Sequence, residues 1–401
     1  MSETWVEVPE GSPFTAANLP YGVFSRPGEP PRVGVAIGDH VLDVSTCRVP
    51  YAADLRVGSL NPFMSRGRAA WIELRERVSD LLGDPAHRSS VAGHLVPRDD
   101  VLLHLPFEVA DYVDFYSSEQ HATNIGRMLR PDAEPLTPNW RHLPIGYHGR
   151  SGTVVVSGTP LVRPCGLRKA PGDDQPSYGP SLRLDIEAEV GFVVGVPSAL
   201  STRVPAEALA DHVFGVVLVN DWSARDIQAF EYVPLGPFLG KSFATSVSPW
   251  VVPLDALEAA RVGSPRQQPA PADYLRTEQP WGLDLTIEVR LNGHLVSRPP
   301  FAGMYWTPAQ QLAHLTVNGA SLRTGDLFAS GTVSGPTRDE RGSLMELSWN
   351  GTEPLTLPDG TTRTFLEDGD TVTITATAPA VGGGRLGFGE VRGTVQPPHS
   401  S

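Results

Sequence analysis

The chain has 401 residues, of which 40 % are hydrophobic and 19 % are charged, so it is long enough for two domains or for one large β-rich domain with a smaller partner. Its 40 glycines and 39 prolines favour many turns and short strands over long helices. The formal net charge of −13 argues against a general affinity for nucleic acid, whose phosphates require a basic surface. A local group of basic residues can still bind an anionic substrate.

We expect a cytoplasmic protein that makes no membrane contact. The amino terminus is acidic and polar and lacks the apolar segment of a signal peptide. The longest strongly apolar run, residues 213–219, is too short to span a bilayer. Cys47 and Cys165 are too few and too far apart for a zinc ribbon or a disulfide framework, and we expect two reduced thiols.

The first hundred residues predict short strands and one helix. Residues 32–37 and 40–44 flank a Gly-Asp pair, which is typical of a hairpin. Residues 69–82 carry apolar side chains at three- and four-residue spacing, which predicts a helix. A domain boundary is expected in 95–107, after which short strands and Gly/Pro turns dominate. Residues 262–281 are rich in Pro and Gln and are expected to form a surface excursion.

The next informative stretch is 111–121, which is rich in acidic and aromatic residues. If it is extended, Asp114 and Tyr116 project to the same side. Ser117 or Ser118 could cap a helix that carries His121. A lone histidine is more often structural than catalytic, and nothing local selects this one from the 11 in the chain.

Residues 182–190 alternate strictly between apolar and polar, which predicts a strand with one buried face. A period of two places Asp185, Glu187 and Glu189 on the same face, with successive members roughly 6–7 Å apart. Two such glutamates could share a divalent ion. The alternative, which most strands of this pattern follow, is a solvated outer face.

A buried strand is predicted at 213–219, with Asp221 just after its carboxyl end. Ser223 followed by Asp226 resembles a helix N-cap with an acid at the third position. A strand end that leads into a helix is a common place for catalytic residues. The alternative is that Asp221 merely caps the turn.

The predicted helix that follows carries Arg225, Gln228 and Tyr232 on one face. A guanidinium, an amide and a phenol on one face suit carboxylate or carbonyl oxygens, although the face could equally be an exposed side. Lys241 comes next. The only other lysine is Lys169, so the chain uses arginine for nearly all of its basic residues. A lysine retained among polar candidate site residues is therefore of interest as a functional residue.

The candidate ligands are all carboxylates, which suit hard cations, so Mg²⁺ or Ca²⁺ is favoured over zinc or copper. No HExxH or CxxC spacing offers a zinc site, and neither a GxSxG nor a GxxxxGKS motif supports a serine hydrolase or a nucleotide hydrolase. These candidate ligands are Asp114, Glu187, Glu189 and Asp221.

Several long blocks resemble the fumarylacetoacetate hydrolase family, and together they span nearly the whole chain. They read LPYGVFS, DYVDFYSSEQHATNIG, LPIGYHGR, VVVSGTP, NDWSARDIQ, YVPLGPFLGKSF, ASGTVSGP and MELSW. The resemblance implies a mainly β fold, with a small SH3-like β-barrel domain at 1–104 and a large β-rich catalytic domain, a mixed β-sandwich roll, at 105–401. It also implies a homodimer.

The resemblance implies that the same four carboxylates bind the metal. It assigns the general base to His121 and its carboxylate partner to Glu346, and it places Arg225 and Lys241 near the metal and the developing charge. The residues that it implies for substrate binding are Tyr116, Arg130, Tyr147, Gln228, Tyr232 and Thr332.

The family pattern also describes a magnesium position near Lys241 and Thr245. Ala244 stands where the pattern GKSFGT has glycine, which puts this second ion position in doubt. Asp185 shares a face with the predicted ligands but is expected to be structural, as is His148.

The implied activity is metal-dependent hydrolysis of the C–C bond of a dicarboxylate β-diketone, fumarylacetoacetate, to fumarate and acetoacetate, the last step of tyrosine and phenylalanine catabolism. The hypothesis uses Mg²⁺ and/or Ca²⁺ as a Lewis acid, and His121, oriented by Glu346, as the base that activates water. Two alternatives stay open. One is another activity of the same family, such as an acylpyruvate hydrolase, a decarboxylase or a hydratase. The other is a metal-stabilised binding or scaffold protein without activity.

Overall fold

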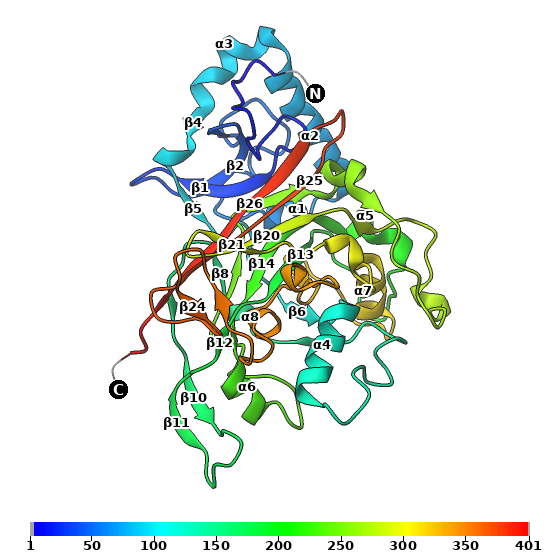
Figure 1. The fold of residues 1–401 in the computed structure, drawn as a ribbon. Helices are drawn as coiled ribbons and strands as arrows, with labels where there is room; N and C mark the ends of the chain where they lie inside the picture. The colour runs from blue at the N-terminus through cyan, green and yellow to red at the C-terminus, as the bar shows by residue number, and fades with distance from the viewer. Residues whose placement is uncertain (1–3, 400–401) are drawn as a thin grey trace.

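The structure, a computed structural model, describes residues 4–399 and consists mainly of strands (Figure 1). Within these residues the largest element is a 13-stranded mixed sheet. Its strands are β1 (Tyr21–Ser25), β2 (Arg32–Ile37), β3 (His40–Leu42), β4 (Leu95–Pro97), β5 (Leu102–His104), β6 (Tyr112–Phe115), β7 (Gly146–His148), β8 (Val154–Val156), β13 (Ala188–Val194), β14 (Val213–Asp221), β16 (Thr245–Val247), β17 (Trp250–Pro253) and β22 (Leu327–Ala329).

The remaining strands form one five-stranded sheet and four short ribbons. The five-stranded sheet contains β9 (Leu161–Val162), β20 (Thr286–Leu291), β21 (His294–Ser297), β25 (Thr371–Pro379) and β26 (Arg385–Gln396). The ribbons pair β10 (Cys165–Arg168) with β11 (Ser177–Pro180), β12 (Leu184–Asp185) with β15 (Ser223–Ala224), β18 (Arg261–Val262) with β19 (Gly282–Leu283), and β23 (Leu355–Thr356) with β24 (Thr362–Arg363).

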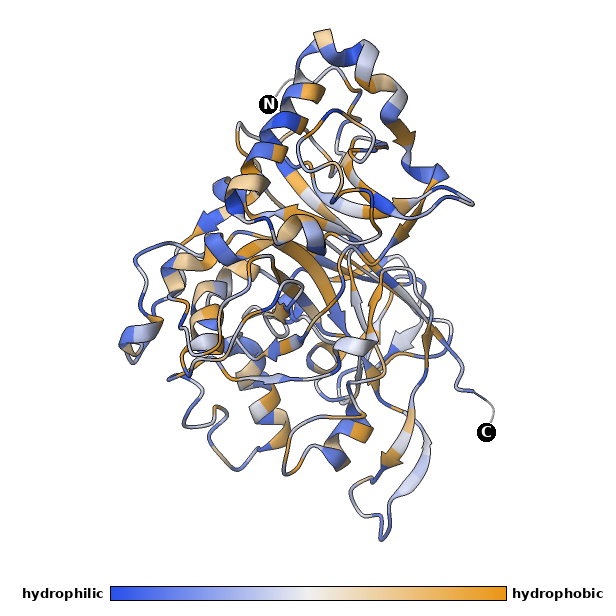
Figure 2. Ribbon diagram, turned by 180° about the vertical axis from the view of Figure 1, so that it is seen from behind, coloured by the Kyte–Doolittle hydropathy of each residue, from blue (hydrophilic) through white to orange (hydrophobic). Residues whose placement is uncertain are grey.

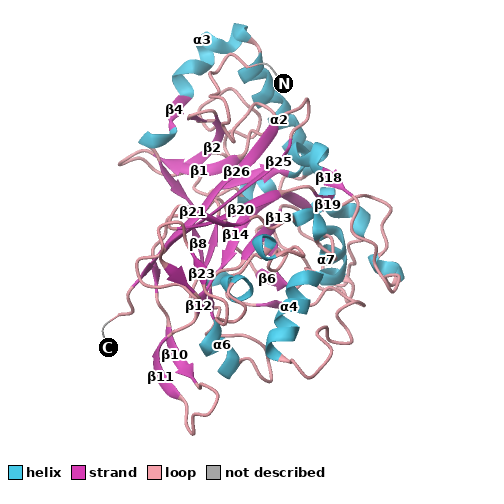
Figure 3. Ribbon diagram, viewed as in Figure 1, coloured by secondary structure: helices cyan, strands magenta, loops and turns pink. Residues whose placement is uncertain are grey.

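Most helices are short and lie around the strands, which run through the middle of the molecule (Figure 3). They are α1 (Asn61–Met64), α2 (Arg68–Gly83), α3 (Arg88–Val91), α4 (Glu119–Leu129), α5 (Leu209–His212), α6 (Arg225–Glu231), α7 (Pro308–Thr316) and α8 (Leu344–Leu347). Between residues 4 and 399 no helix has both the length and the apolar character needed to cross a membrane.

The main path of the large sheet runs β4-β3-β2-β1-β17-β14-β13-β22-β6-β7. The strands from the first hundred residues therefore join the same sheet as those from the middle of the chain. The junction is the antiparallel pair of β1 and β17, with Gly22 opposite Trp250. Glycine is required there, because a Cβ on Gly22 would lie 2.6 Å from a ring carbon of Trp250.

The mainly β prediction is confirmed, but the predicted SH3-like barrel is not. Strands β1 to β5 are part of the open 13-stranded sheet, and the described strands close into no barrel. The division at 104/105 stays a prediction. The predicted hairpin is confirmed by the pairing of β2 with β3, and the predicted helix at 69–82 is confirmed by α2.

Strands β13 and β14 lie at the centre of the molecule, where Figure 2 shows the most hydrophobic ribbons. One face of this pair packs in a hydrophobic cluster that includes Phe192, Leu218 and residues of β25 and β26. The opposite face packs in a second cluster, which includes Val219 and residues of α2 such as Trp71. Both faces are therefore covered, and any polar side chain on these strands is buried.

Candidate metal centre and active site

Four carboxylates meet at one end of the central strands. Asp114 lies on β6, Glu187 lies just before β13, Glu189 lies on β13, and Asp221 ends β14. One oxygen of each lies within 4.8 Å of the others, and all four side chains are buried. Because β13 has β14 on one side and β22, then β6, on the other, sheet order brings together residues that are distant in sequence.

The predicted strand at 182–190 is broken in two. Residues 184–185 form β12, which pairs with β15, and β13 begins at Ala188. The alternative of a solvated outer face is wrong, because Asp185, Glu187 and Glu189 are all at most 5 % exposed. Asp185 accepts hydrogen bonds from the backbone N–H groups of Leu344 and Met345.

The predicted N-cap at Ser223 is wrong. Ser223 belongs to β15, and its hydroxyl donates to the carbonyl of Asp221. Helix α6 begins at Arg225 without a side-chain cap, because pairing of β15 with β12 keeps residues 223–224 extended. By contrast, the predicted cap of α4 is confirmed, and of the two candidates it is Ser118 that accepts from the backbone N–H of His121.

Three buried cations separate the carboxylates, and each contacts two of them. The Nε atom of Arg225 lies 2.9 Å from a carboxylate oxygen of Asp185, and its NH1 atom lies 2.7 Å from a carboxylate oxygen of Glu187. Lys241 lies 2.6 Å from both Glu187 and Asp221. Arg150 lies 2.8 Å from both Asp221 and Asp114. We call this alternating row the charge chain; its members in order are Asp185, Arg225, Glu187, Lys241, Asp221, Arg150 and Asp114.

Glu189 stands outside the charge chain. It is 0 % exposed, and neither of its carboxylate oxygens has a hydrogen-bond partner among the described residues. Burial and the nearby carboxylates of Asp114 and Asp221 raise its pKa well above the ordinary value. An ionised carboxylate in such a position requires a cation.

The other ligand candidates differ in electrostatic surroundings. Burial raises the pKa of Asp114 to about 6, although Arg150 acts against this rise. For Glu187, burial is outweighed by Lys241 and Arg225, which hold its pKa below the ordinary value. Burial lowers the pKa of Lys241, but Asp221 and Glu187 outweigh it and keep the ammonium charged.

These residues fit a hard divalent cation. The four candidates offer only carboxylate oxygens, the donor type that Mg²⁺ and Ca²⁺ prefer, and the orphaned carboxylate of Glu189 supplies a charge that the protein leaves uncompensated. Thr245 donates to the Oδ1 atom of Asp221 at 3.0 Å. Lys241 carries no lone pair when protonated, so it would contribute charge beside a bound ion and would not act as a ligand. The second ion position stays a prediction.

A histidine–carboxylate pair lies next to the cluster. The Nδ1 atom of His121 lies 2.7 Å from Glu346, and Glu346 also accepts from Asn124, Ser334 and Ser343. Burial raises the pKa of Glu346, but His121 and these donors outweigh it and lower the pKa below the ordinary value. A proton on Nδ1 directed at Glu346 leaves Nε2 as the free basic nitrogen.

The residues predicted to bind substrate divide into two groups by their contacts, and the first group consists of Tyr116, Tyr147 and Thr332. Tyr116 packs edge-on against His121, with ring centroids 5.4 Å apart. The hydroxyls of Tyr147 and Thr332 are buried and have no partner among the described residues.

The second group consists of Gln228, Arg130 and Tyr232, whose side chains are exposed or bind other groups of the protein. Gln228 accepts from Arg225 at 3.3 Å. Arg130 and Tyr232 are exposed, and Arg130 donates to the carbonyl of Pro135.

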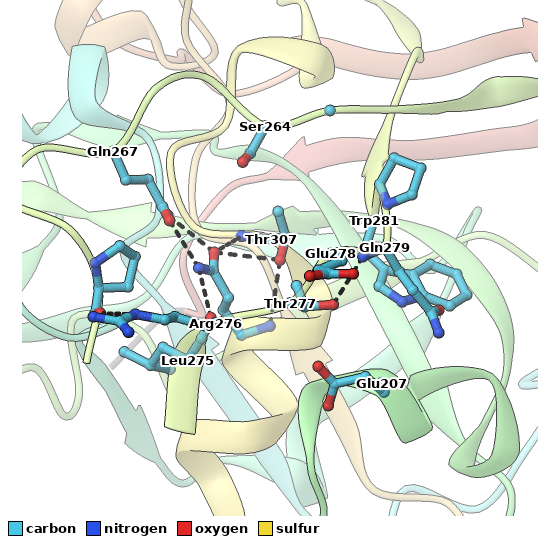
Figure 4. A pocket seen from close by; sticks show the side chains of 14 residues that line it. Glu207, Ser264, Gln267, Leu275, Arg276, Thr277, Glu278, Gln279, Trp281 and Thr307 are labelled. Atoms are coloured by element: carbon cyan, nitrogen blue, oxygen red, sulfur yellow. Dashed lines mark hydrogen bonds between the residues drawn. The ribbon is translucent and has the colours of Figure 1, made fainter. Parts of the chain in front are cut away.

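A pocket of about 880 Å³ lies elsewhere, between the 263–281 excursion and α7 (Figure 4). Gln267, Arg276, Trp281 and Thr307 are among its lining residues, but no predicted site residue lines it. The reactive side chains lie in the carboxylate cluster, so this pocket is not the candidate active site.

Sequence reasoning missed Arg150. Its side chain is 4 % exposed and lies over the rings of Tyr112 and Tyr147, with its guanidinium carbon 4.7 and 4.9 Å from the two centroids. The available signal was its place in the block LPIGYHGR, to which no role for arginine was attached. Asn124, Ser334 and Ser343 were missed because they act only through Glu346.

Fold and site together define a β-sheet protein with a buried carboxylate centre beside a histidine–carboxylate pair. The chain belongs to the fumarylacetoacetate hydrolase family. The family model described as Fumarylacetoacetate (FAA) hydrolase C-terminal matches residues 111–396, and the model described as Fumarylacetoacetase N-terminal matches residues 17–106. The resemblance stated from the sequence is therefore confirmed.

Relatives match along the whole chain. A protein of Homo sapiens named fumarylacetoacetase is 47 % identical over 414 residues, which cover 98 % of this chain and 99 % of the relative. Its namesake in Caenorhabditis elegans is 48 % identical over 419 residues, with the same coverage. Its namesake in Arabidopsis thaliana is 43 % identical over 420 residues, which cover 98 % of each chain.

Solved structures share the fold at low identity. A fumarylacetoacetate hydrolase from the psychrophilic Exiguobacterium antarcticum matches with a TM-score of 0.58 and 18 % identity, over 94 % of this chain and 99 % of its own. A 5-carboxymethyl-2-hydroxymuconate delta-isomerase from Mycobacterium smegmatis matches with a TM-score of 0.51 and 16 % identity, over 95 % of this chain and 100 % of its own.

Proposed function

We propose that this chain hydrolyses the C–C bond of 4-fumarylacetoacetate to fumarate and acetoacetate, as the names of its relatives and its family membership support. This reaction is the last step of tyrosine and phenylalanine catabolism. One observation carries the proposal to the residues: an orphaned carboxylate, Glu189, lies in a buried four-acid cluster beside the paired His121 and Glu346. We assign the ion, Mg²⁺ or Ca²⁺, to the four acids of that cluster.

In the proposed mechanism, His121 removes a proton from the attacking water through Nε2. Glu346 fixes the Nδ1–H tautomer and stabilises the imidazolium that forms. Because Glu346 already accepts from three other side chains, its carboxylate cannot turn away when the histidine charge changes. The proton then passes from His121 to the leaving carbon, which becomes the methyl group of acetoacetate.

Attack on the diketone places negative charge on oxygen and then on the departing enolate. A bound divalent ion would polarise the diketo oxygens as a Lewis acid. Arg225 is the main donor candidate on the protein side, since its NH2 atom is buried and has no partner among the described residues. Gln228 and Lys241 are the other donors that we assign to this charge. Removal of one such donor typically costs about 2.7–4 kcal/mol of barrier.

The substrate has carboxylates and carbonyls, and we assign their contacts to the predicted binding residues. The unpartnered hydroxyls of Tyr147 and Thr332 suit hydrogen bonds to buried oxygens. Arg130 supplies a cation for a carboxylate. Tyr116, beside His121, and Gln228 and Tyr232, on and after α6, complete the proposed set.

We also propose a cytoplasmic homodimer with a first domain at 1–104 and the catalytic domain at 105–401. Two separate family models match the chain, and the gap between them at residues 107–110 lies close to the proposed boundary, which supports a division into two units. An exposed apolar segment supports association of two copies, since single exposed apolar residues are ordinary but a run of them is not. This segment contains Phe230, Val233, Leu235, Phe238 and Leu239.

The test follows loss of the ultraviolet absorbance of fumarylacetoacetate with Mg²⁺, with Ca²⁺, and after chelation. We expect turnover with at least one ion, loss on chelation, and recovery when the ion is restored. Turnover that is indifferent to chelation would contradict the metal assignment. Absence of turnover with either ion, together with cleavage of an acylpyruvate, would favour another activity of the family.

A further inference from the structure

We propose that Arg150 is a positioning residue that sets the charge of the metal centre to the value that one divalent ion neutralises. It also holds Asp114 and Asp221 at a fixed separation. This inference rests on the proposed metal-dependent function and concerns a residue outside the predicted base, ligand and substrate sets.

The charge count comes from the ion pairs. The charge chain holds four carboxylates and three cations, and Glu189 adds a fifth carboxylate without a partner. With all of these groups ionised, five negative charges against three positive ones leave −2. A single divalent ion beside Glu189 brings the total to zero. A buried site of low dielectric favours such a balance.

The position of Arg150 is built into the fold. Its φ is +62°, in the left-handed region that non-glycine residues rarely adopt, and its NH2 atom donates to one oxygen of Asp114 and one of Asp221, at 2.8 Å each. Its guanidinium also lies over the rings of Tyr112 and Tyr147. An arginine keeps its charge at any pH at which the protein is folded, so its contribution to the count is constant.

Arg150 is also the cation that joins separate parts of the site. Asp114 comes from β6 and Asp221 from β14, and in the sheet β13 and β22 lie between these strands. Without Arg150 the two carboxylates would face each other without a cation between them, and like charges at short range repel. The net charge of the centre would then be −3. A divalent ion would bring this charge to −1, and a trivalent ion would bring it to zero.

The inference therefore predicts a change in ion preference. In Arg150→Gln, which removes the charge but keeps an N–H donor, we expect the ratio of trivalent to divalent affinity to rise at least about tenfold, the effect of one added charge near the ion. In Arg150→Lys, which keeps the charge, we expect a ratio near that of the unchanged protein. The probes are Tb³⁺ and Ca²⁺, titrated by calorimetry without substrate.

Two controls separate this role from a general loss of structure. Arg163 is another buried arginine, paired with Asp368 and with two backbone carbonyls. Arg163→Met should lower the melting temperature but leave the ion ratio unchanged. Asp185→Asn removes one negative charge at the far end of the charge chain, so the ratio should fall, opposite to Arg150→Gln.

The outcomes are distinct. An unchanged ratio in Arg150→Gln, or a ratio in Arg150→Lys that matches Arg150→Gln, would overturn the inference. If Arg150→Gln does not fold, Asp185→Asn decides the charge count, and an unchanged ratio there would overturn it equally. Failure of the unchanged protein to bind Ca²⁺ or Mg²⁺ would instead contradict the proposed metal-dependent function.

Discussion

Glu189 and Glu346 are both 0 % exposed, yet their surroundings are opposite. Glu346 accepts from His121, Asn124 and two serine hydroxyls, while Glu189 accepts from none of the described residues. The pKa of Glu346 is lowered, because its donors outweigh burial. The pKa of Glu189 is raised by burial and by neighbouring carboxylates.

The site therefore has two sides. On the completed side, around Glu346, the protein itself supplies the hydrogen-bond donors; on the open side, around Glu189, it supplies none among the described residues. Buried polar groups are almost always paired in native proteins, and an unpaired buried carboxylate is costly. The pair of His121 and Glu346 is assembled before any ligand arrives. Three cations pair with the other carboxylates of the cluster, but Glu189 has no partner among the described residues, which fits a position that a metal ion completes.

The largest effect is expected on the completed side. In His121→Ala we expect kcat to fall by about 10²–10⁴, the usual contribution of a general base, with ion affinity unchanged because the imidazole is not one of the four acids. Steady-state kinetics and calorimetry measure the two. His148→Ala is the matched control, since this exposed histidine pairs with Asp111 and is outside the proposed site; a near-normal rate in His121→Ala would remove the base assignment.

The next effect is expected on the open side. In Glu189→Gln we expect ion affinity to fall by more than the roughly 10–100-fold that loss of an outer-shell partner costs. The ion-free protein should be at least as stable as before, because a buried carboxyl group without a partner is gone. Calorimetric titration and melting curves with and without Ca²⁺ test this. A retained ion-dependent rise in melting temperature would show that Glu189 is not a ligand.

The same substitution of Gln for Glu at position 346 should have the opposite pattern: a loss of stability with ion affinity nearly unchanged. In Glu346→Gln we expect the ion-free protein to lose about 1–3 kcal/mol of unfolding free energy, because an amide cannot accept from all of the donors that face it. Ion affinity should stay within a few-fold of the unchanged protein. Denaturant unfolding and calorimetry give both values, and equal ion-affinity losses in the two Gln variants would erase the contrast between the sites.

The smallest effect is a pH dependence confined to the open side. Burial raises the pKa of Asp114 from 3.8 to about 6, so the ion-free folded state binds more protons than the unfolded state between these values. The contribution of Asp114 to the stability of the ion-free protein therefore falls as the pH rises from 3.8 to about 6. Because an ion requires the deprotonated ligand, affinity should weaken about tenfold per pH unit below 6. Melting curves at pH 5 and 7.5, with Ca²⁺ and with chelator, should show a larger ion-dependent rise at 7.5; equal rises would contradict this.

Local pattern found the parts of the site that lie on regular strands. The alternation around Glu187 and Glu189 and the place of Asp221 after an apolar run pointed to them. The cap at Ser118 was readable because capping depends on neighbours in sequence. Period two also pointed to Asp185, which joins the charge chain through Arg225 but is outside the four-acid cluster, since the strand is interrupted before Ala188.

Other features depend on contacts that no local pattern encodes. Arg150 follows a three-residue strand, β7, and reaches carboxylates on β6 and β14, which the order of the sheet separates by β13 and β22. Glu346 lies 225 residues from His121 and was assigned only through the family resemblance. Ser223 has the composition of a helix cap, but pairing with β12 determines its conformation.

The edge of β1 has a consequence for how the chain is made. One side of β1 pairs with β2, and the other is shared: Val23–Ser25 pairs with β5, while only Tyr21 and Gly22 pair with β17. At a synthesis rate of about 5–20 residues per second, β17 leaves the ribosome roughly 10–45 s after β1. During that interval β2 and β5 can already cover most of β1. The nascent chain then presents an unpaired edge only two residues long, too short to recruit a strand from another chain.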